Sequence, residues 1–362
     1  MNEEYLIKDI REMGHFKDET FSGFKKREVY TTLFKSIETN KVENACYWIT
    51  ECIISGYTLD ILEKLLIFSS KIIHINNPRL PCFLLKKYET LELTIKHLTN
   101  KDDYLHLRNT QSIRNLFFDL ITTLCTSSKQ NRYDKYPKLK PEIDFDFLQI
   151  KNKLIATMQC VPSYILKFSD PEELRIVINE LIYNLKNNLG SYERVCYWVT
   201  WIFEWEKIQK KKHGSWEIEE REIQGIPSKY CKEVVWLLWE VIIDETKCRD
   251  ENTKIQINAL YQLYKHKYTT GRKNSRLPII YHVMGYLTHT INFNIPIRND
   301  TQIFIQSQCN VNLMFKSKKI NEKNNDILPL LKKKAPPKQN ISKEKCNDKL
   351  NLLNDFDLII NH

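Results

Sequence analysis

A six-residue aromatic motif occurs twice in this chain, and the repeat constrains the fold more than any other feature of the sequence. ACYWIT at residues 45–50 reappears as VCYWVT at residues 195–200, 150 positions later. Each copy follows a segment in which apolar residues recur at three-to-four spacing. Such spacing is typical of amphipathic helices, so the repeat predicts a duplicated helical unit.

Further landmarks recur downstream in the same order. They are apolar runs that begin at Tyr57 and Tyr230, the tripeptide RLP at 79–81 and 276–278, and the related strings RNTQ at 108–111 and RNDTQ at 298–302. We therefore expect an all-α protein made of two related helical bundles from an internal duplication, at residues 1–126 and 143–315. In both copies the Cys-Tyr-Trp motif is expected to place its tryptophan, Trp48 or Trp198, in the core.

The second copy is longer than the first because it contains two insertions, near 207–229 and 245–270. Both insertions are polar, so we expect them to form surface loops or arms. Between the bundles, residues 127–142 read as a basic linker that contains proline. Residues 316–348 are rich in Lys, Asn and Pro and are expected to form a disordered basic linker.

Residues 349–362 form a short amphipathic segment. Its apolar residues fall at helical spacing, and a dozen residues are marginal as an isolated helix in water, so we expect it to fold only when a partner receives it. Asp355 and Asp357 favour an apolar groove rimmed with positive charge. The alternative is a last helix packed on its own bundle. The predicted partner-docking residues are Leu352, Leu353, Phe356 and Ile359.

The sequence carries no recognisable catalytic motif. It lacks a P-loop, a G-x-S-x-G elbow, an HExxH pair and a Rossmann glycine fingerprint. No CxxC pair is present, and the ten cysteines are scattered through apolar runs, as expected for reduced thiols inside a cell. We therefore predict a soluble intracellular protein that is not an enzyme, has no cofactor and no metal site, and does not span a membrane.

The formal net charge of +10 is unevenly distributed along the chain. Basic residues cluster in and beside the two insertions, where tyrosines are interleaved with them, and such clusters can follow a phosphate backbone and stack bases. The alternative is that these are solubilising lysines encoded by an AT-rich gene. The candidate nucleic-acid-binding residues are Lys210, Lys211, Lys212, Lys265, Lys267, Arg272, Lys273 and Arg276.

Residues 28–118 resemble the C-terminal helical domain of the replication-associated RarA/MgsA/WRNIP-type AAA+ ATPases, which is related to the clamp-loader collar. The resemblance rests on FKS at 34–36, ACYW at 45–48, NPR at 77–79 and HLRN at 106–109. It implies a collar-like helical fold that joins subunits, without the ATPase module. Residues 71–74, KIIH, depart from the acidic, glycine-containing segment usual in that family.

The overall layout is similar to that of uncharacterised helical proteins of large DNA viruses. Together these features predict an oligomerising scaffold or accessory factor in DNA replication or repair that contacts nucleic acid, located in a viral factory of the host cytoplasm or in the nucleus. Its expected partners are nucleic acid, further copies of itself, and a replication or virion protein bound by the segment 349–362. The alternative is a structural protein of the virion or of its assembly with no nucleic-acid role.

Overall fold

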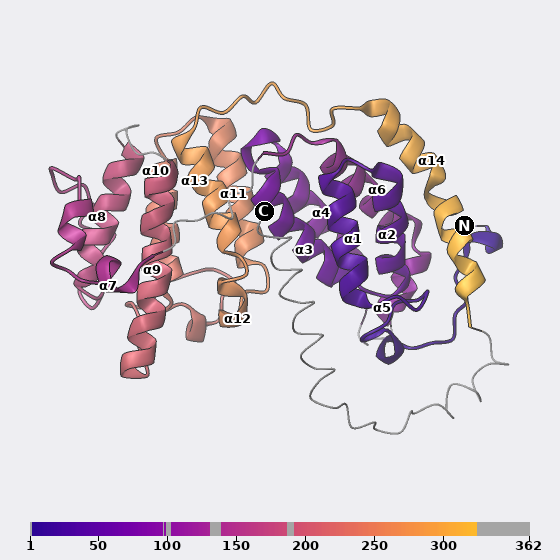
Figure 1. Cartoon of the computed structure of the whole chain (residues 1–362), viewed down its shortest axis with the longest axis horizontal. Coiled ribbons are helices and arrows are strands. Elements are labelled where there is room, and N and C mark those ends of the chain that lie inside the picture. The colour runs from indigo at the N-terminus through magenta and orange to yellow at the C-terminus, as the bar shows by residue number, and fades with distance from the viewer. Residues whose placement is uncertain (1, 97, 99–102, 131–138, 187–191, 324–362) are drawn as a thin grey trace. The chain divides into compact units, whose positions relative to one another are not determined.

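The computed structural model describes residues 2–96, 98, 103–130, 139–186 and 192–323. These residues form α-helices and short 3-10 turns and contain no β-strand, so the predicted all-α fold is confirmed (Figure 1). The first helices are α1 Lys26–Glu38, α2 Val42–Ile54, α3 Thr58–Ile72, α4 Leu80–Ile95, α5 Asp103–His106 and α6 Gln111–Thr126. They are followed by α7 Pro141–Asp144, α8 Glu173–Lys186, α9 Tyr192–His213, α10 Val234–Thr246, α11 Glu251–Lys265, α12 Thr270–Lys273, α13 Leu277–Thr288 and α14 Thr301–Lys318.

The duplicated landmarks fall on corresponding helices. The Cys-Tyr-Trp motifs lie on α2 and α9, which pack against the preceding helices α1 and α8. Pro81 and Pro278 occupy the first turns of α4 and α13, where a missing backbone N–H costs nothing. We call α1–α6 the first bundle and α8–α13 the second bundle.

The insertion at 245–270 is not a surface loop, which corrects the prediction. It forms α11, whose apolar face is buried at Ile257, Leu260, Leu263 and Tyr264 and packs on α4 and α13. Although the segment is polar overall, its apolar residues recur at the three-to-four spacing of an amphipathic helix. The insertion at 207–229 is also partly internal, because Arg221 is buried in an ion pair with Asp170.

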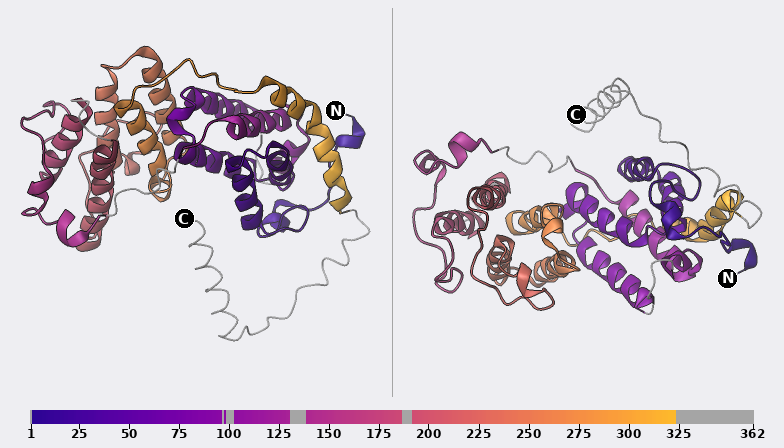
Figure 2. Two further views of the ribbon diagram at one scale, coloured as in Figure 1. Left: turned by 45° about the horizontal axis from the view of Figure 1, so that its top comes forward. Right: turned by 90° about the horizontal axis from the view of Figure 1, so that it is seen from below.

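Helix α14 returns to the first bundle and packs along α6 and α2 (Figures 1 and 2). The predicted second unit, 143–315, would have assigned most of this helix to the second bundle. Two polar contacts hold the segment before α14 against the first bundle. Asn77 Nδ2 donates to the Ile297 carbonyl at 3.0 Å, and Arg298 pairs with Asp119 at 2.6 Å. A tertiary path of this kind has no signature in local sequence.

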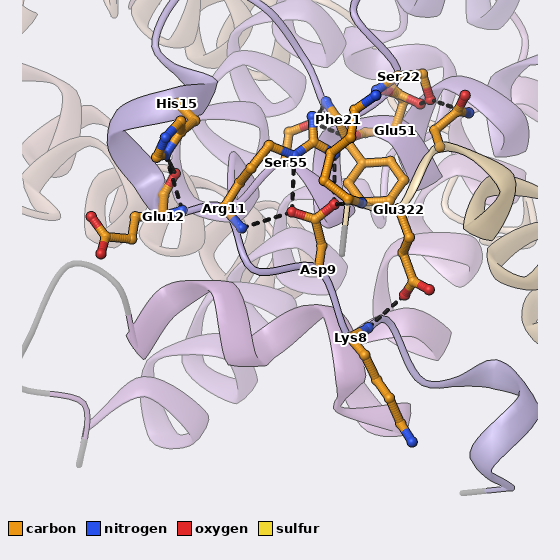
Figure 3. A network of polar contacts seen from close by, with 12 residues as sticks. Lys8, Asp9, Arg11, Glu12, His15, Phe21, Ser22, Glu51, Ser55 and Glu322 are labelled. Carbon is orange, nitrogen blue, oxygen red and sulfur yellow. Dashed lines mark hydrogen bonds and ion pairs between the residues drawn. The ribbon is translucent and has the colours of Figure 1, made fainter. Parts of the chain in front are cut away.

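Lys318, at the end of α14, shows that the predicted linker begins too early at residue 316. Its Nζ lies 2.7 Å from Oε2 of Glu51, and both side chains are almost fully buried. The ammonium also lies 3.4 Å from the Tyr47 ring centroid. The Glu51 carboxylate accepts from the backbone N–H and hydroxyl of Ser22 as well (Figure 3). Although burial opposes its ionisation, these partners hold the pKa of Glu51 below its usual range.

The two repeated tryptophans are not equivalent. Trp198 is buried, and so are Trp201 and Trp205, whose rings stack with centroids 5.0 Å apart, so these three tryptophans of α9 belong to the core. Trp48 is only partly buried and packs edge-on to Phe24 at 5.3 Å. The prediction of a core position is therefore confirmed for Trp198 and wrong for Trp48.

A pair of buried histidines lies where α13 meets the first bundle. His282 on α13 and His74, in the turn after α3, have ring centroids 6.5 Å apart, and His282 stacks on Tyr286. Burial lowers the pKa of His74 to about 3 and places the pKa of His282 well below its usual value. Both rings are therefore neutral at physiological pH.

A second, small compact unit contains residues 8–11 and 322–323 of the described chain. Within it the Asp9 carboxylate accepts hydrogen bonds from the Arg11 guanidinium and from the Lys323 N–H (Figure 3). The predicted docking residues Leu352, Leu353, Phe356 and Ile359, and all of the predicted linker beyond 323, lie outside the described residues. So do residues 131–138 of the first predicted linker.

Replacing Lys318 by Ala should lower the free energy of unfolding by about 3–5 kcal/mol, because it leaves the buried Glu51 carboxylate without its cation. Lys316→Ala in the same helical turn is the matched control, since it removes an exposed pair with Glu4 and a contact 6.0 Å from the Tyr5 ring centroid, and leaves no buried charge. Chemical denaturation of both full-length variants measures the difference. Equal, small losses would show that Glu51 does not depend on Lys318.

Acid should destabilise the protein through the histidine pair. Because the folded pKa values lie below the unfolded value of about 6.5, protons bind the unfolded chain preferentially as the pH falls below that value. Each neutral histidine then removes up to about 1.4 kcal/mol of stability per pH unit. His282→Phe should make the loss of stability between pH 7 and pH 5 shallower in thermal denaturation, and an unchanged pH profile would contradict this account.

Candidate nucleic-acid interface

The last turn of α9 carries the most accessible of the predicted basic residues. Lys211, Lys212 and His213 are exposed, and the two lysines have no ion-pair partner among the residues that the structure describes. The end of α9 projects beyond α8 and α10 in Figure 1. Cations at a helix C-terminus are favoured by the helix dipole, which is a structural reason for lysine here. Their exposure also leaves them free to meet an anion.

Lys210, one position earlier, is already engaged. Its Nζ lies 2.9 Å from Oε1 of Glu206, one helical turn before it on α9. The other carboxylate oxygen of Glu206 lies 2.5 Å from Nζ of Lys273, a residue of α12. The beginning of the first insertion and the short helix α12 after the second insertion therefore meet at the buried carboxylate of Glu206.

Lys273 is buried between two carboxylates and is not available to a ligand. Besides Glu206, its Nζ lies 3.0 Å from Oε2 of Glu233. Glu233 also accepts from the Tyr268 hydroxyl at 2.8 Å and from the Thr270 hydroxyl at 2.6 Å. Despite burial, these partners hold the pKa of Glu233 below its usual range. The prediction that Lys273 contacts nucleic acid is therefore wrong, because its ammonium neutralises the buried carboxylates of Glu206 and Glu233.

Arg276 is likewise a structural cation. Its guanidinium is buried, donates to Glu63 of α3 at 2.9 Å and 3.1 Å, and donates to the carbonyls of Tyr264 and His266. Residue 276 belongs to the repeated tripeptide RLP, but its guanidinium joins the two bundles. Its assignment to the nucleic-acid surface is also wrong.

The remaining candidates are partly neutralised. Arg272 lies 3.4 Å from Glu63, and Lys267 lies 3.5 Å from Glu92 of α4. Lys265 rests over the ring of Tyr261 with its Nζ 4.6 Å from the centroid, and burial lowers its pKa. Their cationic field is therefore weaker than the sequence suggests. Of the eight predicted residues, Lys211 and Lys212 have the least compensated charge.

Sequence reasoning missed the acidic half of this network. Glu206, Glu233 and Glu63 decide which cations stay exposed, yet each reads locally as an ordinary surface glutamate. The one local signal is Glu206 four residues before Lys210, a favourable spacing for an ion pair on a helix. The contacts to α3, α10 and α12 depend on tertiary packing.

The described residues contain no group of three or more His, Cys, Asp or Glu side chains that could hold a metal ion. Nor does any helix in the described part of the chain combine the length and apolar character needed to cross a membrane. No protein-family model, curated protein or solved structure matches this chain.

Replacing Lys273 by Gln should lower the free energy of unfolding by about 3–5 kcal/mol, because Glu206 and Glu233 lose the cation between them. Lys267→Gln, an exposed position with a single weak pair, is the control and should leave stability nearly unchanged. Urea denaturation distinguishes the two. A Lys273→Gln variant as stable as the Lys267→Gln variant would show that Glu206 and Glu233 do not need the Lys273 ammonium.

Proposed function

We propose that this protein is a non-enzymatic, self-associating helical scaffold or accessory factor in DNA replication or repair, and that it contacts nucleic acid through the last turn of α9. The observation that carries the nucleic-acid role is the pair of exposed lysines, Lys211 and Lys212, at the end of α9. The other lysines of this helix, Lys207 and Lys210, form ion pairs with glutamates, as does the neighbouring Lys273. Uncompensated charge is what a phosphate backbone attracts.

The rigidity of the α9 end supports this assignment. Trp201 and Trp205 are buried against Phe145, so the helix is firmly packed two turns before the lysines. The basic turn is therefore presented in a fixed position and not on a loop, which reduces the conformational entropy lost on binding. A contact of this size gives sequence-independent binding, as an accessory factor needs.

Self-association is supported by the resemblance of residues 28–118 to a domain that joins subunits. The scaffold role is supported by the absence of a recognisable catalytic motif from the sequence. A viral origin, with location in a cytoplasmic factory or in the nucleus, rests on the similarity of the overall layout alone.

The test is binding of a fluorescent single-stranded or duplex DNA to the full chain, followed by anisotropy over a range of salt concentrations. Binding should weaken as salt rises. Lys211→Gln/Lys212→Gln should weaken it further and reduce the slope of log affinity against log salt, for each lost phosphate contact, by about 0.9 on duplex DNA and about 0.7 on a single strand. Lys35→Gln/Lys86→Gln removes the same charge from exposed lysines of the first bundle that have no ion pair with any described residue, and is the matched control.

Two results would contradict the proposal. Equal weakening by both double variants would assign binding to net charge and not to the end of α9. An absence of binding at low salt would favour the alternative, a structural protein of the virion or of its assembly that has no nucleic-acid role.

A further inference from the structure

An open apolar groove runs between α10 and α11. Its volume is about 390 Å³. Along α10 it is lined by Ile243, Thr246 and Lys247, and along α11 by Lys254, Ile257 and Tyr261. Ile243 is 39% exposed, although nearly every other apolar side chain of α10 is buried. The groove therefore exposes apolar surface at a place where the rest of the helix belongs to the core.

The two helices present one continuous face. On α10, Thr246 and Lys247 follow Ile243 by three and four positions, and on α11, Ile257 and Asn258 follow Lys254 by the same spacing, with Tyr261 one turn further, so each set lies on one side of its helix. The helices are consecutive, contact each other and are joined by a short turn. The side chains of two adjacent helices form ridges with a groove between them, and a third helix can pack into such a groove. The shape fits an amphipathic helix better than a flat protein surface.

Two lysines rim this groove. The exposed Lys247 pairs with the largely buried Asp244 carboxylate at 2.7 Å, and Lys254 pairs with the exposed Glu251 at 3.6 Å. Both are pairs within one helix, a type that contributes little to stability and is readily exchanged. Tyr164 bounds the Lys247 side, because its hydroxyl donates to Asp244 at 2.7 Å. The rim can therefore offer two ammonium groups to carboxylates of a bound peptide.

One segment of this chain has the complementary pattern. In residues 349–362, Leu352, Phe356 and Ile359 fall at i, i+4 and i+7, and Asp355 and Asp357 flank Phe356. We propose that residues 349–362 of one copy bind in the α10–α11 groove of a second copy. The apolar residues occupy the groove, and the aspartates meet Lys247 and Lys254. This inference rests on the proposed self-association and supplies a contact for it.

The chain itself shows how a related sequence is received. Asp144-Phe145-Asp146-Phe147 shares the order Asp-Phe-Asp-apolar with residues 355–358. Phe145 packs on Trp201 with ring centroids 5.5 Å apart, and the Asp144 carboxylate accepts from the Tyr197 hydroxyl at 2.6 Å and pairs with Lys153. The Asp-Phe-Asp motif thus packs on the aromatic side chains of α9, with Lys153 beside its first aspartate. Tyr261 and the two rim lysines provide the same chemistry in the groove.

A contact between a segment of one copy and a groove of the next is heterologous. The two surfaces differ, so each copy keeps one free segment and one free groove unless a ring closes. Assembly by this route therefore depends on concentration and is blocked by altering either surface.

The direct test measures binding of a fluorescent synthetic peptide with the sequence of residues 349–362. The receiving protein is the full chain with Phe356→Asp, which weakens its own segment and leaves the groove free. Adding Ile243→Asp should weaken peptide binding about tenfold or more, because it replaces an apolar side chain of the groove by a carboxylate. Ile255→Asp is the matched control, because Ile255 is 46% exposed on α11 and does not line the groove. Reversal of the rim charges, Lys247→Glu/Lys254→Glu, should be rescued by a peptide with Asp355→Lys and Asp357→Lys.

Light scattering of the full chain at micromolar concentration then tests assembly. The mass should exceed one chain and should fall with Ile243→Asp but not with Ile255→Asp. Peptide binding that is insensitive to Ile243→Asp would overturn the groove assignment. Peptide binding at the groove with a strictly monomeric full chain would overturn docking between copies. If the oligomer persists in the Ile243→Asp variant, this inference fails while the proposed self-association and nucleic-acid binding remain.

Discussion

Three carboxylates of the first bundle each receive a cation from the last third of the chain. Glu63 pairs with Arg276, Asp119 with Arg298, and Glu51 with Lys318. The Glu51–Lys318 pair is the most deeply buried of the three. Removing one partner from such a pair leaves a charge in a medium of low dielectric constant, which costs far more than the pair itself contributes. These contacts therefore fix where the second half of the chain lies against the first.

The path of α14 follows from these pairs. Arg298 lies before the helix and Lys318 at its end, so both ends of α14 are tied to carboxylates of the first bundle. Between them the buried residues Val311 and Phe315 pack inward, and the guanidinium of Arg114 stacks on the Phe315 ring at 3.8 Å. A helix that continues the second repeat in sequence becomes part of the first bundle in space.

The same use of cations limits the basic surface. A positively charged chain suggests a broad interface for phosphates, but Lys273 and Arg276 neutralise internal carboxylates, and Arg272 and Lys267 lie against acids of the first bundle. Of the eight basic residues predicted to meet nucleic acid, only Lys211 and Lys212 at the end of α9 are exposed with no ion-pair partner among the described residues. The proposed nucleic-acid contact depends on charge and the proposed docking of residues 349–362 on apolar burial, so experiment can separate them.

Local spacing determined the helices of this protein. The three-to-four pattern of apolar residues predicted α1 and α8, and the repeated motif located α2 and α9 and placed Trp198 in the core, because an amphipathic helix buries the face on which its apolar residues recur. Tertiary structure alone decided which charges are internal. Lys211 and Lys273 look alike in sequence, yet one is exposed and the other is buried between Glu206 and Glu233. The difference comes from carboxylates on other helices, tens of residues away, and no local pattern encodes that proximity.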